Sequence, residues 1–181
     1  MKKIMFNDKY GLTHAVLEGR KTQTRRTFLK PGEETLLDGI TPEYLISVRS
    51  RYKVGETIAI AQSYADITPQ VDWVKCMIRK EKLGWNNKMF VRAEDMPHHI
   101  RITKIRIERL QDIKSEDCLN EGIWRAGDVG FEGTTYWYHG LANTSFRTPQ
   151  EAYASLIDRI SGKGTWASNP YVFVYDFELI N

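Results

Sequence analysis

The segment LEGRKTQTRR, residues 17–26, gathers side chains that could do chemistry. Four cations stand within seven residues of it: Arg20, Lys21, Arg25 and Arg26. Cations are favoured near the carbonyl end of a helix, and this ordinary explanation suffices for Arg20. The other cations could instead hold an anion such as a phosphate group, or form a field that lowers the pKa of an amine among them. The residues alone leave both possibilities open.

Lys21 and Thr24 are the residues of this segment that could act as a base and a nucleophile. A hydroxyl nucleophile needs an adjacent base that takes its proton. Thr24 could supply a hydroxyl, and Lys21 could remove its proton if the amine were partly neutral. The two side chains share a face in a turn or a helix end, but they point to opposite faces of an extended strand. A solvated cation for Lys21 and a solvent-facing strand residue for Thr24 are the plain alternatives.

Glu121 stands at the end of a predicted helix, SEDCLNEG, residues 115–122. We expect Ser115 to be the N-cap of this helix and Gly122 to terminate it. A negative charge in the last turn opposes the helix dipole. The acid therefore calls for a cationic partner, unless it is exposed and costs the helix about a few tenths of a kcal/mol.

The hydrophobic pattern predicts the elements that must position these residues. A short helix is expected at 11–19, ending at Gly19, and a longer one begins at Pro149. Polar, Gly-containing residues between 73–79 and 88–93 indicate a hairpin. Three further segments read as strands: 55–63, 99–109 and 171–179.

The segment HHIRITKIRIERL contains the clearest strand, but its apolar phase slips. Ile100 and Ile102 share one face, whereas Ile105 and Ile107 share the other. A bulge near Thr103 and Lys104 would restore the alignment, as in a strand that bends round a barrel. A strand with two buried faces is the alternative.

Four segments together resemble a known family, the ASCH domain. They span most of the chain: GRKTQTRR, YKVGETIAIAQSY, MPHHIRITKIRIERLQDIKSEDCLNEGI and LIDRISGKGTWASNPYVFVYDFEL. The ASCH domain belongs to the PUA-like superfamily of small β-barrels, and the closer resemblance is to ASCH-like proteins common in phage and prophage genomes. The resemblance implies an α+β fold, a PUA-like small mixed β-barrel with flanking short helices. It also implies a single domain over 1–181, with insertions around 66–98 and 124–148.

One position departs from the family pattern. Where the phage relatives usually carry an Arg-Glu pair after the second strand, this chain has Ala61-Gln62. Any role of that carboxylate in the family therefore does not carry over to this chain.

Many PUA-like domains bind RNA or modified bases, so the resemblance implies such a ligand here. The first expectation is that a basic cleft binds RNA or a modified nucleoside through Arg25 and Arg26, with Tyr64 as a stacking platform. The aromatic residues 136–138, in an expected ordered loop, are further candidates for stacking.

A second resemblance, to a bacterial ASCH amidohydrolase, implies catalysis. That enzyme removes the acyl group from N4-acetylcytidine, and the likeness assigns its catalytic residues to Lys21, Thr24 and Glu121. Direct attack by water, with Thr24 only positioning the substrate, is a variant of the mechanism. A third reading is a phage-derived interaction module without a small ligand.

Composition sets wider limits on the protein. The chain has 181 residues, 41% hydrophobic and 27% charged, with a net charge of +3, all ordinary for a globular domain. Cys76 and Cys118 stand far apart, and the four histidines show no zinc-binding spacing. We therefore expect no metal and no cofactor. We also expect no membrane segment and a cytoplasmic location, because no apolar run approaches about 20 residues.

Overall fold

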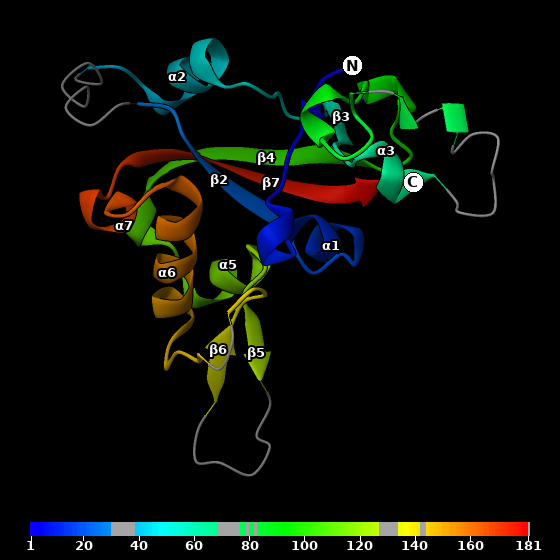
Figure 1. Ribbon diagram of the computed structural model, residues 1–181. Helices are drawn as coiled ribbons and strands as arrows, with labels where there is room; N and C mark the ends of the chain where they lie inside the picture. Colours follow the sequence, from blue (N-terminus) through cyan, green and yellow to red (C-terminus); the bar gives the residue numbers. More distant parts are fainter. Residues whose placement is uncertain are drawn as a thin grey trace.

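The fold is built round a five-stranded sheet in the order β1-β3-β4-β7-β2. The computed structural model describes residues 1–29, 39–68, 77–78, 80–81, 83–126, 134–141 and 144–180. The strands of this sheet are β1 (Lys3–Ile4), β2 (Gln23–Thr27), β3 (Thr57–Ile60), β4 (His99–Arg109) and β7 (Tyr171–Ile180). β1 runs parallel to β3, and every other pairing is antiparallel. Figure 1 shows β4 and β7 as the long central pair.

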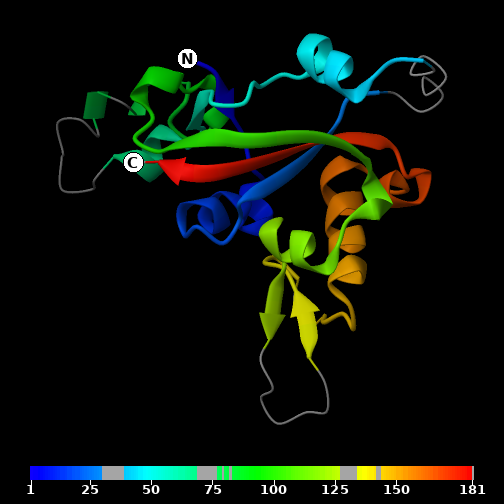
Figure 2. The same ribbon diagram turned by 180° about the vertical axis from the view of Figure 1, so that it is seen from behind.

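The bulge predicted in β4 is confirmed. Its register against β7 shifts between Ile102 and Lys104, which leaves Thr103 as the extra residue. Ile100 and Ile102 are fully buried before the bulge, whereas Ile105 and Ile107 are partly buried after it. Because a one-residue shift exchanges the faces of a strand, the bulge lets both isoleucine pairs pack against the core. Figure 2 shows the bend of β4 along its length.

Helices cover both sides of the central strands. The helices α1 (Leu12–Leu17), α5 (Ser115–Asn120) and α6 (Pro149–Ser161) lie on one side, and α2 (Pro42–Arg49) lies on the other (Figures 1 and 2). Covered in this way, β7 is buried on both faces from Val172 to Tyr175, as its apolar sequence predicts. The shorter elements are α3 (Tyr64–Ile67), α7 (Thr165–Ser168) and the 3-10 helices η1 (Asp8–Tyr10), η3 (Lys88–Phe90), η4 (Ala93–Asp95) and η5 (Leu110–Asp112).

The helix ends follow the sequence signals closely. Gly19 has φ 72° after α1 and Gly122 has φ 103° after α5, a left-handed backbone that glycine adopts without strain. Thr148 and Glu151 form a reciprocal capping box at the start of α6. One boundary differs from prediction, because Lys114 is the N-cap of α5 and Ser115 is its first residue. The hydroxyl of Ser115 accepts a hydrogen bond from Gln150 Nε2 instead of capping the helix.

Two predictions about local structure are wrong. Residues 77 and 78 are helical and residues 88–90 form η3, so these positions are not in the strands predicted for the hairpin of 73–79 with 88–93; residues 73–76 and 79 lie outside the described residues. The Asn87 side chain caps η3 by accepting from the Met89 amide. In the predicted loop 124–148, β5 (Trp124–Ala126) pairs with β6 (Thr135–Trp137). Trp124 stacks on Trp137 across this pair, with ring centroids 5.3 Å apart.

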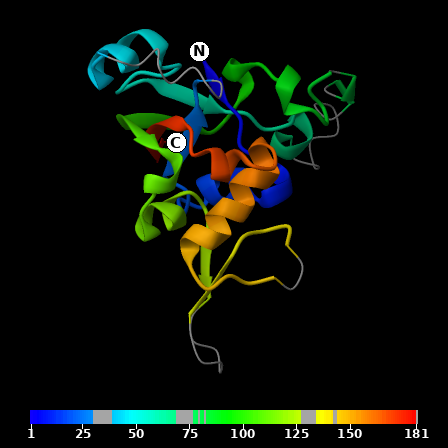
Figure 3. The same cartoon turned by 90° about the vertical axis from the view of Figure 1, so that its left-hand side faces the viewer.

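The hairpin β5–β6 projects from the body of the molecule (Figure 3). The two edge strands of the main sheet, β1 and β2, are joined by a side chain: Arg26 Nη2 in β2 donates to the carbonyl of Met5, 2.7 Å away, directly after β1. The sheet and short helices together make a mixed α+β fold. Along the described chain, no helix has both the length and the apolar character needed to span a bilayer.

Candidate functional site

Lys21 is buried at the junction between α1 and β2. After Gly19 reverses the chain, the amides of Arg20 and Lys21 both donate to the carbonyl of Ala15, at 2.9 Å. This tight turn places Lys21 just before β2, with its side chain directed inward and only 2% of the residue exposed. The interpretation of Lys21 as a solvated cation is therefore wrong.

The Lys21 ammonium makes a buried ion pair with Glu121. Lys21 Nζ lies 2.5 Å from Glu121 Oε2, and it also donates to the carbonyls of Gln23 (2.7 Å) and Glu121 (2.9 Å). All three N–H donors of a charged lysine are thus used. Burial lowers the pKa of Lys21 below its ordinary value, while the Glu121 charge opposes this shift. The prediction that the acid at the end of α5 has a cationic partner matches this geometry.

Arg25 is also buried, and it is the second cation of Glu121. Its side chain is 0% exposed, and Nη1 donates to Glu121 Oε1 at 3.2 Å and to the side chain of Gln23. Its Nη2 lies 3.2 Å from both Glu108 and Asp117. Burial alone would lower the pKa of Arg25, but the carboxylates round it, Glu121 foremost, raise it.

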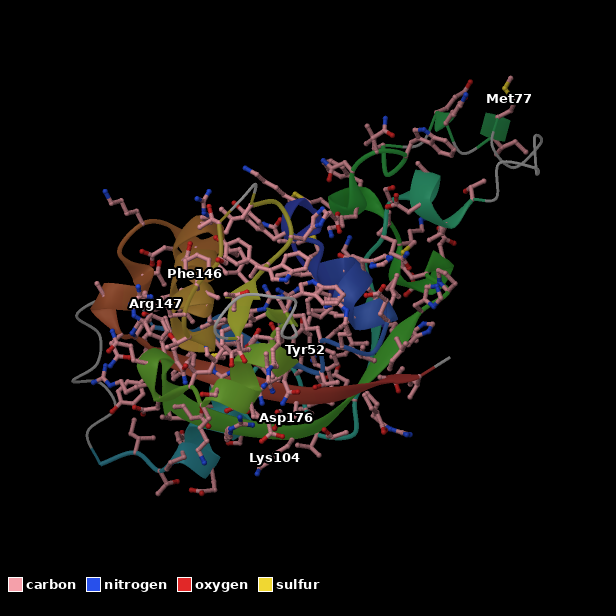
Figure 4. All side chains as sticks on the ribbon, turned by 90° about the horizontal axis from the view of Figure 1, so that it is seen from below. Tyr52, Met77, Lys104, Phe146, Arg147 and Asp176 are labelled. Carbon is pink, nitrogen blue, oxygen red and sulfur yellow. The ribbon has the colours of Figure 1, made fainter. Side chains whose placement is uncertain are left out.

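A second arginine extends the network across the sheet. Arg106 on β4 contacts Glu108, Asp117 and Asp176, and Gln23 Nε2 donates to Asp117 and Asp176 at 3.1 and 2.5 Å. Figure 4 labels Asp176 on β7 beside Lys104 on the neighbouring β4. We call the whole set the charge network. Three cations in it face four carboxylates, and Lys21, Arg25 and Glu121 are buried whereas the others are partly buried: Arg106, Glu108, Asp117 and Asp176.

Thr24 lies close to this network but does not bond to Lys21. Because Lys21 precedes β2 and Thr24 is within it, the strand alternation does not separate them, and both line the same cavity. Thr24 is buried, and its hydroxyl makes no hydrogen bond to any residue in the described part of the chain. The nucleophile–base contact that the threonine mechanism requires is therefore not made in this structure.

The cavity that contains Lys21, Thr24 and Glu121 has a volume of about 1260 Å³. Its walls come from the segment 5–17, from β2, from residues 62–66 after β3, from residues 86–89 and from α6. Tyr153, Leu156 and Ile157 of α6 provide an apolar wall, and Gln62, Ser63 and Asn87 provide polar atoms. A deep cavity with apolar walls and a few convergent polar groups is typical of a small-molecule site.

The basic cluster of the sequence is largely neutralised. Arg20 pairs with Glu18 at 2.7 Å and lies over the ring of Trp124, so its role is more than helix capping. Lys21 and Arg25 are buried against carboxylates. Of the four cations, Arg26 alone is exposed, at the rim of the cavity. The expected basic cleft, with Arg25 free to bind phosphate, is therefore not what the structure shows.

The aromatic candidates for base stacking are covered. Tyr64 is 2% exposed, its ring packs against Gly84 and its hydroxyl donates to Asp95, so this ring has no free face. Tyr138 is fully buried and its hydroxyl meets that of Ser155, while Tyr136 is partly buried in β6. The predicted stacking roles of Tyr64 and Tyr138 are thus wrong, because both rings belong to the core.

Sequence reasoning missed several members of the network: Gln23, Arg106, Glu108, Asp117 and Asp176. A usable signal existed for some of them. Asp117 and Glu121 stand four residues apart on one helix face, and Arg106 and Glu108 stand two apart on one strand face. Within the described ranges, no group of three His, Cys, Asp or Glu side chains is arranged to hold a metal ion.

Comparison with known proteins gives little. No protein-family model matches the chain, and no curated protein matches it. Among solved structures, the chain is similar to the crystal structure of protein EF3133 from Enterococcus faecalis V583, described with the family model DUF984. The identity is 15% and the TM-score 0.42, with 99% of this chain and 80% of that chain covered. At this level the likeness carries no argument about function.

Proposed function

We propose that this chain is an ASCH-type amidohydrolase that removes the acyl group from an N4-acylated cytidine or a similar base. The observation that carries the proposal is the buried Lys21–Glu121 pair on the wall of a ligand-sized cavity. A buried ion pair costs desolvation energy that a hydrophobic pair of similar volume avoids. Its position in the cavity therefore supports a chemical role.

The proposal also includes the PUA-like barrel as the type of fold. The contact between Arg26 and the Met5 carbonyl brings the two edge strands of the sheet together, as a nearly closed PUA-like barrel would. A single domain over residues 1–181, with the hairpin β5–β6 inside one of its insertions, agrees with this arrangement.

The geometry favours a mechanism in which Lys21 and Glu121 exchange protons. Lys21 has no lone pair while all three N–H groups donate, so it becomes a base only after passing a proton to Glu121. Burial lowers the pKa of Lys21 and so favours its neutral amine. The neutral amine then takes a proton from water as the oxygen attacks the acyl carbonyl, and the Glu121 acid protonates the leaving nitrogen. Cytidine and a carboxylic acid are the products.

Thr24 supplies a hydroxyl in the same cavity as the Lys21–Glu121 pair. Its lack of a hydrogen bond to Lys21 supports the variant in which water attacks and Thr24 positions the acyl group. The threonine nucleophile stays the alternative, because contacts of this kind often tighten only when substrate binds.

A panel of N4-acylated cytidines, incubated with the protein and followed by chromatography, tests the proposal. We expect loss of the acyl group with release of cytidine. Under the water mechanism Thr24→Val lowers kcat/KM by about ten-fold, as for the loss of one positioning hydrogen bond. Under the nucleophile mechanism Thr24→Ser retains activity and Thr24→Val has none. If the wild-type protein cleaves no member of the panel, the proposed activity is wrong.

Binding without turnover is the second candidate, and the same cavity supports it. Arg26 is exposed at its rim, where it could meet a phosphate of a nucleotide or of RNA. The third candidate, an interaction module without a small ligand, predicts an exposed apolar patch and no cleft. A cavity lined by Lys21, Thr24 and Glu121 argues for a ligand instead.

A further inference from the structure

Gln62 carries a buried side-chain oxygen that has no hydrogen-bond partner among the described residues. It follows β3 on the cavity wall, and only 8% of the residue is exposed. Its backbone N–H contacts the sulfur of Met96, but its carboxamide makes no hydrogen bond to any residue in the described part of the chain. A buried polar group left unsatisfied costs about 1–3 kcal/mol, so such groups are rare unless something else satisfies them.

The surroundings of Gln62 make this observation stronger. Other polar residues nearby are satisfied: Ser63, the next residue, donates to Asp66, and Lys88 across the cavity bonds to Asp8, Thr13 and the Phe6 carbonyl. The local structure therefore provides hydrogen-bond partners for the neighbouring polar side chains. Gln62 Oε1 and Arg25 Nε are the buried side-chain polar atoms that find no partner in the described part of the chain, and Gln62 lines the same cavity as the Lys21–Glu121 pair.

We infer that Gln62 determines the ligand specificity of the cavity. Its carboxamide forms hydrogen bonds with an edge of the ligand that carries a hydrogen-bond donor next to an acceptor. A carboxamide offers one acceptor and two donors on a plane, so it pairs in a bidentate way with such an edge. This inference rests on the proposed function, which supplies the edge: the N–H that carries the acyl group and the neighbouring ring nitrogen of the base. The Gln62 oxygen accepts from that N–H, and the Gln62 amide donates to the ring nitrogen.

The inference predicts opposite effects on stability and on binding. Replacing an unsatisfied buried amide by an apolar side chain of similar size removes a desolvation cost. Gln62→Leu should therefore have a Tm equal to or above that of the wild type. The same substitution should weaken the binding of N4-acetylcytidine by about ten-fold, because a bidentate pair is lost. A glutamine with only a structural role would give the reverse pattern.

The experiment uses the full chain and two probes, N4-acetylcytidine and its N4-methyl derivative, which lacks the N–H. Calorimetry measures the Kd of each probe, chromatography measures acyl loss, and a thermal melt gives Tm, for wild type, Gln62→Leu and Gln62→Glu. The wild type should prefer the probe with the N–H, and Gln62→Leu should lose this preference. The matched control is Gln150→Leu, a glutamine outside the cavity whose amide donates to Ser115, which should keep the preference.

The outcomes distinguish a failure of the Gln62 inference from a failure of the proposed amide hydrolysis. Preferential binding that depends on Gln62 supports the inference, with or without turnover. If this binding occurs without turnover, the proposed catalysis is wrong. Turnover with equal kcat/KM for wild type and Gln62→Leu overturns the inference and leaves catalysis in place. A fall in Tm for Gln62→Leu with unchanged probe binding also overturns it, as does the absence of any binding or turnover.

Discussion

At the scale of single residues, the buried Lys21–Glu121 pair determines what the site can do. Two carbonyls and the guanidinium of Arg25 hold the pair in place, so its geometry is set before any ligand arrives. The plain alternatives from the sequence, a solvated Lys21 and an exposed Glu121, are both wrong, because both residues are buried.

Breaking the pair should destabilise the protein strongly. Lys21→Met leaves Glu121 with Arg25 as its remaining cation and leaves two buried carbonyls without a donor, so the free energy of unfolding should fall by about 3–5 kcal/mol. Urea titration monitored by circular dichroism measures the change. The exposed pair Arg101–Glu178 is the control, and Arg101→Met should cost less than about 1 kcal/mol. Equal small losses in both variants would show that the Lys21 pair is not buried in solution.

Cys118, on α5 beside this network, gives a prediction about alkaline pH. Burial raises the pKa of its thiol from an ordinary 9.0 to about 12. Above pH 9 the unfolded chain releases this proton while the folded chain keeps it, so the free energy of unfolding should fall as pH rises toward 12. Urea unfolding at about pH 8 and about pH 10.5 should show a smaller loss in Cys118→Ala than in the wild type. An identical loss in both proteins would contradict the burial of the thiol.

At the scale of elements, the bulge in β4 brings the network and the core into register. Arg106 and Glu108 follow the bulge, so their contacts with Asp176 and Arg25 depend on it. Deleting Thr103 would turn residues 104–109 over, placing these charges where Ile105 and Ile107 now pack. The deletion should prevent cooperative unfolding, as seen in a thermal melt. Thr103→Ala, at an exposed position, should change the free energy of unfolding by less than about 0.5 kcal/mol.

Elements with a strong local signal could be predicted from the sequence. Gly19, Gly122 and Pro149 mark helix ends that the structure confirms, and the phase slip of four isoleucines revealed the bulge. The failures have a common physical cause. The strand β6 and the helix η3 depend on contacts with distant residues or on one capping side chain, which periodicity does not record.

The site was predicted in part for the same reason. The acid at the end of α5 indicated a cationic partner for Glu121, and the family resemblance pointed to Lys21. The sequence could not show that Arg25 points into the core, because that depends on carboxylates 83, 92 and 96 residues away in the chain. The burial of Tyr64 was missed for the same reason, because it depends on Gly84 and Asp95, which are distant in the chain and cover the ring.

At the scale of the whole molecule, charge argues against strong binding of RNA. The net charge is +3, and three of the four clustered cations are paired with carboxylates. RNA affinity should therefore be weak, and between about 50 and 200 mM salt its logarithm should fall with a slope near that of one or two phosphate contacts. Fluorescence anisotropy with a labelled RNA measures the slope, and Arg26→Ala should reduce it by about 0.7. A steep slope that Arg26→Ala leaves unchanged would contradict this description of the surface.

The central claim is that the Lys21–Glu121 pair carries out amide hydrolysis in the cavity. The most direct measurement is the rate of acetate release from N4-acetylcytidine by the wild type and by the double variant Lys21→Met/Glu121→Gln. This double variant removes both members of the pair together, so it leaves no unpaired buried charge from either and should stay folded better than Lys21→Met alone. The account predicts release of acetate by the wild type and none above background by a folded double variant. Equal rates in the two proteins would contradict it.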